Sequence, residues 1–122
     1  CALLKRKNKI YEIVKEMRKT TKKPITLKIR IGYVNKSHLD YDLLYSLGCD
    51  GIFIHARTCK QKYSGNIDFD YLKEAKEKSQ IPIIANGDIK RFEDVLKIYN
   101  YSKVDGFMIG RAILHNPKVF RD

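Results

Sequence analysis

Hydrophobic residues gather in four short runs, at residues 25–32, 51–57, 81–87 and 106–111. The runs are rich in isoleucine and phenylalanine, and their apolar residues stand next to one another instead of alternating with polar ones. This pattern is typical of strands that are buried on both faces, as in a parallel sheet. We therefore predict four parallel strands.

A helix is predicted on either side of the first run. The apolar residues before it follow the i, i+3, i+4, i+7 spacing of an amphipathic helix: Ile10, Ile13, Val14 and Met17. After it, the SHLD segment at 37–40 has the spacing of a capping box, and Gly48 is placed to end the helix that follows.

Further helices are predicted at residues 69–78 and 92–99, and the NPKVF segment at 116–120 predicts the start of another, with Pro117 at its first position. Strand starts are about 25 to 30 residues apart, which is the size of a βαβ unit. Repetition without a Rossmann glycine fingerprint favours an α/β fold of the (β/α)8 TIM-barrel class. Four strands make half of such a barrel, because a complete one needs about 250 residues.

Composition and charge narrow the class of protein. The 122 residues are 43% hydrophobic and 32% charged, which indicates a globular domain. Lys and Arg total 25 against 14 Asp and Glu, a net charge of +11, and such an excess attracts polyanions, above all nucleic acid. The alternative is that these lysines merely cover solvated faces.

The sequence gives little indication of targeting, of a metal site or of disulfides. No apolar run approaches the roughly 20 residues of a membrane span, and no signal-peptide pattern is present, so we expect a cytoplasmic protein with no membrane partner. The chain lacks an initiator methionine, which suggests a piece of something longer. Because Cys1, Cys49 and Cys59 form no CxxC pair, we expect neither a metal site nor a disulfide framework.

Polar residues stand where each predicted strand ends. Chemistry in TIM barrels gathers at these carboxyl ends. The residues in question are Lys28 and Arg30, then His55, Arg57 and Thr58, then Asn86, Gly87 and Asp88, and finally Gly110 and Arg111. The alternative is that these residues have structural roles only: a lysine that reaches solvent, a hydrogen-bonded core histidine and ordinary turn glycines. Glycines after the third and fourth strands also allow close backbone approach to a phosphate.

Four blocks of the sequence, PITLKIRIG, IHARTCKQKYSGNIDFDYL, IPIIANGDI and DGFMIGRAILHNPKVF, resemble successive blocks of the tRNA-dihydrouridine synthases. HART followed by QxYxG is the most specific part. The resemblance implies an FMN-dependent TIM barrel that reduces uridine in tRNA to 5,6-dihydrouridine with NADPH. It also implies that residues 1–122 are a partial FMN-binding domain carrying strands five to eight of the barrel.

The resemblance assigns roles to individual residues. Lys28 corresponds to the lysine that contacts the flavin ring, and His55 to the histidine near the flavin and the base. The residues that correspond to the ribityl-phosphate site are Asn86, Gly87, Asp88, Gly110 and Arg111. The basic loop after the second strand is expected to contact tRNA through Arg57, Thr58, Lys60, Gln61 and Tyr63.

The family's catalytic acid is a cysteine in an upstream Asn-x-Gly-Cys-Pro loop, and Cys1, Cys49 and Cys59 do not match it. We therefore expect no catalytic residue in this chain, and an isolated fragment that is inactive and self-associates through its open sheet edges. Two alternatives stay open: another FMN-dependent pyrimidine oxidoreductase, and a non-catalytic RNA-binding fragment.

Overall fold

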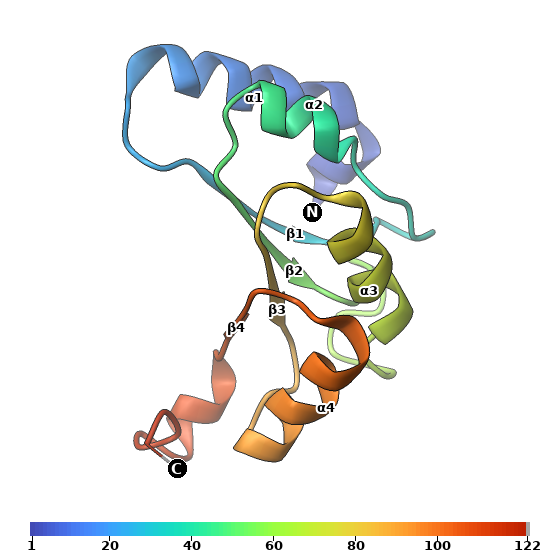
Figure 1. Cartoon of the computed structure of the whole chain (residues 1–122). Helices are drawn as coiled ribbons and strands as arrows, with labels where there is room; N and C mark the ends of the chain where they lie inside the picture. The colour runs from blue at the N-terminus through green and yellow to red at the C-terminus, as the bar shows by residue number, and fades with distance from the viewer. Residues whose placement is uncertain (122) are drawn as a thin grey trace.

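One parallel sheet organises the computed structural model, which describes residues 1–121. The strands are β1 (Thr26–Arg30), β2 (Gly51–His55), β3 (Ile83–Asn86) and β4 (Gly106–Met108). They lie in the order β1-β2-β3-β4, every neighbouring pair is parallel, and the sheet is open at β1 and β4 (Figure 1). The predicted α/β fold with four parallel strands is confirmed.

Helices connect the strands. They are α1 (Lys7–Thr20), α2 (Tyr41–Ser46), α3 (Phe69–Lys78) and α4 (Phe92–Ser102), with short 3-10 turns η1 (Ala2–Lys5) and η2 (Arg111–Leu114) near the two ends. The α-helices lie on one side of the sheet, while β4 leads into η2 on the other side of the picture (Figure 1). The sheet therefore keeps one face uncovered by helices.

The core lies between the sheet and the helices. Ile52, Ile54 and Ile83 are fully buried there with Leu44 and Leu72 from the helices. Only β2 is buried on both faces as predicted; β3 alternates between buried and half-buried residues, and β1 is an edge strand with exposed positions. The prediction was wrong for these strands because their second face borders open space instead of a second layer.

Aspartates cap the amino ends of α2 and α3. Asp40 caps α2 by accepting from the Leu43 amide at 3.0 Å, and Asp68 caps α3 by accepting from the Tyr71 amide at 2.9 Å. The predicted cap at Ser37 was wrong, since the residue that bonds the free helix amide is three positions later. Gly48 does end α2 with a positive φ of 91°, a conformation that glycine adopts without steric strain.

The segment after η2 also departs from its prediction. Residues 117–121 form turns and not a helix, with a hydrogen bond from the Val119 amide to the Asn116 carbonyl at 3.0 Å. Val119 is buried but Phe120 is 69% exposed, so a single packed apolar residue is too little support for a helix here. Among the described residues, no helix is long and apolar enough to cross a membrane.

A disulfide joins Cys1 to Cys59, across a sequence separation of 58 residues. The expectation that the cysteines form no disulfide was therefore wrong. Spacing alone could not reveal it, because the two residues meet only when the loop after β2 folds back beside η1. The bond ties the amino end of the chain to that loop. Cys49 remains a buried thiol.

Candidate functional site

The carboxyl ends of the strands lie in one row. In the sheet register, Arg30 pairs with His55, His55 with Asn86, and Asn86 with Met108. The amide of the Asn86 side chain donates to the Met108 carbonyl at 2.9 Å and so ties β3 to β4 at this row. Parallel strands bring all four ends to the same edge, where loops can build a site.

A pocket of about 870 Å³ opens at this edge. This volume lies within the range of about 300–1,000 Å³ that is common for small-molecule and cofactor sites. Its charged lining consists of Lys28, Arg30, Lys90, Arg91 and Arg111 together with one carboxylate, that of Asp88. Five cations against one anion make the pocket a suitable place for a negatively charged ligand.

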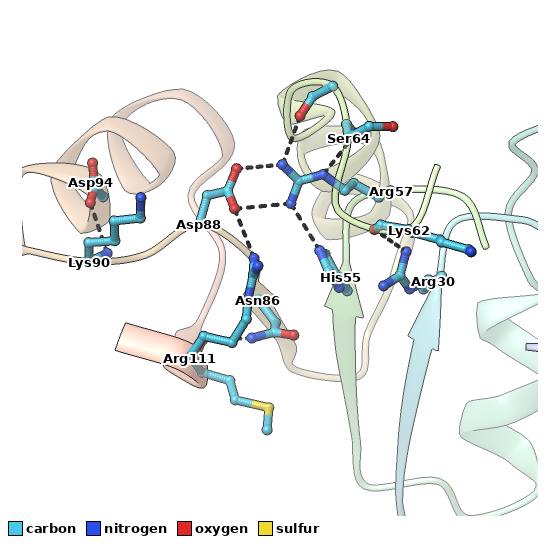
Figure 2. Close-up of polar contacts among 12 residues, drawn as sticks. Arg30, His55, Arg57, Lys62, Ser64, Asn86, Asp88, Lys90, Asp94 and Arg111 are labelled. Atoms are coloured by element: carbon cyan, nitrogen blue, oxygen red, sulfur yellow. Dashed lines mark hydrogen bonds and ion pairs between the residues drawn. The ribbon is translucent and has the colours of Figure 1, made fainter. Parts of the chain in front are cut away.

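At the pocket lies an ion pair between a buried arginine and a partly exposed aspartate. Arg57 is only 2% exposed, and its guanidinium grips the Asp88 carboxylate with two bonds, Nη1 to Oδ1 at 3.1 Å and Nη2 to Oδ2 at 2.5 Å (Figure 2). The remaining donors reach the carbonyls of Ser64 at 3.1 Å and Gly65 at 2.7 Å. Hydrogen bonding to Arg57 holds the pKa of Asp88 below its usual range.

The turn after β3 has an unusual backbone. Gly87 and Asp88 have positive φ angles of 118° and 53°. A Cβ on Gly87 would lie 2.5 Å from Ile67 and 2.7 Å from the His55 ring, so only glycine fits here. The turn therefore brings the backbone against the His55 ring and aims the Asp88 carboxylate at Arg57. Arg111 reaches the same carboxylate at 3.3 Å.

His55 sits at the centre of the row and is 5% exposed. Its Nε2 lies 3.2 Å from Nη1 of Arg57 (Figure 2). Burial, reinforced by the positive charges of Arg30, Arg57 and Lys28, lowers the pKa of His55 to about 4. At neutral pH the imidazole is therefore uncharged.

Tyr63 stands over the cationic side of the pocket. Its ring centroid is 3.9 Å from the guanidinium carbon of Arg111 and 5.5 Å from that of Arg30, both within cation–π range. Arg30 also donates to the Thr58 and Lys62 carbonyls at 3.0 and 2.5 Å. Tyr63 is 58% exposed, so part of its side chain remains accessible to a ligand.

The loop that carries Tyr63 is held by its own polar residues. The Gln61 side chain accepts from the Thr58 amide at 2.8 Å, and the Thr58 hydroxyl accepts from the Gln61 amide at 3.3 Å. Lys60 and Lys62 are exposed on the outer side of this loop. The side chains of Lys60 and Lys62 therefore project from a loop whose backbone is held by hydrogen bonds.

Comparisons with known proteins identify the family. The family model described as dihydrouridine synthase (Dus) matches residues 1–122. The chain belongs to the dihydrouridine synthase family. The family predicted from the sequence blocks is thus confirmed.

Relatives of this synthase-family chain are bacterial and eukaryotic. It is 38% identical over 116 residues to a probable tRNA-dihydrouridine synthase of Aquifex aeolicus, covering 91% of this chain and 36% of that protein. It is 37% identical over 123 residues to tRNA-dihydrouridine synthase B of Pasteurella multocida, covering 98% and 37%. It is 32% identical over 122 residues to the tRNA-dihydrouridine(20a/20b) synthase [NAD(P)+] of Schizosaccharomyces pombe, covering 98% and 37%. The chain therefore spans little more than a third of the length of these curated relatives.

Most site residues predicted for this synthase-family chain line the one pocket. They are Lys28, His55, Tyr63, Asn86, Gly87, Asp88, Gly110 and Arg111. Arg57 and Thr58, which we expected to contact RNA, are buried at 2% and 8% exposure. The donors of the Arg57 side chain are bonded to Ser64, Gly65 and Asp88 within the protein. Lys60 and Gln61 lie outside the pocket lining, on the adjoining loop.

Arg30 was among the polar residues predicted at a strand end, where it shares the face of β1 with Lys28, but it was assigned no role there. Other pocket residues were missed by sequence reasoning because they carried no usable signal. Lys90, Arg91 and His115 belong to loops whose path the sequence pattern does not fix.

Proposed function

We propose that this chain supplies the flavin-binding and base-binding side of an enzyme that reduces uridine in tRNA to 5,6-dihydrouridine, with FMN as cofactor and NADPH as reductant. The observation that carries the proposal is the cationic pocket at the carboxyl ends of four parallel strands in a chain of the dihydrouridine synthase family. The names of its relatives refer to tRNA dihydrouridine, and one refers to NAD(P)+.

The four strands are proposed to be strands five to eight of a (β/α)8 barrel. Their parallel order, the helices on one side and the two unpaired edges at β1 and β4 fit half of such a barrel. Within it, residues 1–122 form a partial domain. A chain expressed alone would expose both edges, which favours self-association over turnover.

The pocket fits FMN by charge and by space. Arg111 and Lys28 supply positive charge for the phosphate and for the reduced ring. A Cβ added at Gly110 would meet nothing within 4 Å, so the backbone there is open to a close ligand, whereas Gly87 lets the turn after β3 pack against His55. When bound there, FMN would supply the hydride chemistry that no side chain can perform.

The side chains do the supporting chemistry. The ammonium of Lys28 stabilises negative charge that develops in the pocket. A proton must also reach the pyrimidine ring. Cys49 is buried, with its pKa raised by desolvation, and Cys1 and Cys59 are joined. None of the three is a suitable acid, so we assign that proton to a cysteine outside these residues.

Contact with tRNA is proposed for the loop that carries Lys60, Gln61 and Tyr63. The two exposed lysines at positions 60 and 62 suit phosphate oxygens, and the half-exposed Tyr63 ring suits a base face. Arg57 and Thr58 are proposed to support this loop from below. The net charge of +11 favours a polyanionic substrate over a small one.

The test uses the parent polypeptide, by which we mean the longest native polypeptide that contains these 122 residues. Purified parent polypeptide is expected to carry flavin absorbance and to form dihydrouridine in unmodified tRNA when NADPH is added. Lys28→Ala should weaken FMN retention by tenfold or more, since a charged hydrogen bond contributes about 1.5–3 kcal/mol. Lys22→Ala, an exposed lysine outside the pocket lining, is the matched control.

Three outcomes separate the candidate functions. Flavin with reduction of free pyrimidines but not of tRNA would indicate a small-substrate oxidoreductase. Binding of tRNA without flavin would indicate an RNA-binding module. A colourless protein that binds no FMN on reconstitution would overturn the proposal.

A further inference from the structure

Arg57 has a contact that its role as an ion-pair partner does not require. Its Nη1 lies 3.2 Å from Nε2 of His55, while the same nitrogen also donates to Asp88. A guanidinium has donors only and stays protonated at any physiological pH. For this contact to be attractive, Nε2 of His55 must offer its lone pair, which places the ring proton on Nδ1 and leaves the imidazole neutral.

The guanidinium cannot turn away from this contact. Its Nε donates to the Ser64 carbonyl, and Nη2 donates to both the Gly65 carbonyl and the Asp88 carboxylate. With the plane fixed at these points, Nη1 must face His55. The ring is fixed as well, because Gly87 packs directly against its Nε2 edge.

The other ring nitrogen faces the pocket. Among residues 1–121, no protein group bonds to Nδ1 of His55, and no buried side-chain nitrogen lacks a partner, so Nδ1 retains contact with the pocket that His55 lines. An Nδ1–H there is a neutral hydrogen-bond donor.

We infer that Arg57 is a positioning residue that fixes the ring proton of the uncharged His55 on Nδ1, so that His55 offers the pocket a neutral hydrogen-bond donor and not an imidazolium acid. The inference deepens the proposed function, on which its catalytic meaning rests. The surrounding charges agree with it. Lys28 and Arg30 from β1 and Arg57 from the loop after β2 all disfavour an imidazolium, and Asp88 after β3 is the one described carboxylate that opposes them.

The experiment reads the tautomer directly. The parent polypeptide is labelled with 15N-histidine, and long-range 1H–15N spectra are recorded from pH 8 to pH 5. The His55 signals are assigned by their loss in His55→Gln, which separates them from those of every other histidine, His38 and His115 included. We expect a protonated, pyrrole-type Nδ1 and an unprotonated, pyridine-type Nε2 over this whole range.

Arg57→Lys tests the cause. Lysine keeps the positive charge but lacks the planar fork, so it cannot hold Asp88 and His55 together. We expect the Nε2–H tautomer to appear, whereas the titration midpoint of His55 should stay low, because its burial and the positive charge at position 57 both remain. Arg91→Lys alters a pocket arginine at the start of α4, and it should leave the tautomer of His55 unchanged.

Each result decides the inference. A wild-type spectrum with the proton on Nε2, or with an imidazolium at pH 7, would overturn it even if Arg57→Lys does not fold. A folded Arg57→Lys protein with an unchanged tautomer would reduce Arg57 to a structural brace and overturn it too. Neither readout needs turnover, so a failure of the proposed function, seen as absence of flavin or of dihydrouridine, is distinguishable.

Discussion

Replacing Asp88 with Asn should destabilise the fold through Arg57. The change removes the counterion of a guanidinium that is 2% exposed, while asparagine tolerates the local φ of 53°. Breaking a fully buried ion pair by removing one partner costs about 3–5 kcal/mol. The Asp88 side chain is 41% exposed, so water can replace part of the interaction. We therefore expect a decrease of about 2–3 kcal/mol in the free energy of unfolding.

The assay is urea unfolding of the parent polypeptide, followed by far-ultraviolet circular dichroism. The matched control is Glu12→Gln, which neutralises a carboxylate of similar pairing distance, 2.8 Å from Lys9, on an exposed helix surface. That control should produce no measurable change, because solvent screens such pairs. If Asp88→Asn were no more destabilising than Glu12→Gln, the Arg57–Asp88 pair would not be a main support of the site.

Three further predictions concern pH, salt and redox state. The pKa of His55 is about 4 in the fold against an ordinary value of 6.5, so the unfolded state binds more protons between pH 4 and pH 6.5. His55 should therefore contribute about 3 kcal/mol to the free energy of unfolding above pH 6.5, and this contribution should disappear as the pH falls to 4. In a series of urea midpoints measured against pH, His55→Gln should show a weaker pH dependence over this range. Binding of tRNA should weaken as the salt concentration rises. In a Lys60→Gln/Lys62→Gln double variant, the slope of the logarithm of the association constant against the logarithm of the salt concentration should become shallower by about 0.7–0.9 for each phosphate that is no longer neutralised. An unchanged slope would show that these lysines do not contact tRNA. Reducing the disulfide should lower the unfolding free energy by about 4 kcal/mol on loop entropy for a separation of 58 residues, and a Cys1→Ser/Cys59→Ser protein should no longer respond to dithiothreitol.

The strands could be predicted because their signal is local. A run such as IPIIA at 81–85 reports burial and extension by itself, and the order of runs and helical spacings then indicates a parallel sheet. The residue that caps the start of α2 was harder to predict. Ser37 and Asp40 are both good capping residues within one short segment, and only the path of the chain decides that Asp40 accepts from the helix.

The side chains of the site were predicted by position but not by partner. Lys28 and Arg111 follow from the rule that strand ends carry chemistry. Arg57 looked equally available to RNA, because the sequence does not tell whether a charged residue at a strand end faces out or in. Its burial depends on the carboxylate of Asp88, which lies 31 positions later in the turn after β3. No residue within the HART segment indicates that pairing.

The order of the strands has a consequence for how the protein is made. Each strand pairs with the one synthesised before it, so that β2 adds to β1, β3 to β2 and β4 to β3. A nascent chain can therefore add one strand and one helix at a time as it leaves the ribosome, without waiting for a distant partner. The bond between Arg57 and Asp88 closes only once the third strand has emerged. Ligand-binding competence would thus appear only after most of the hydrophobic layer under this sheet has formed.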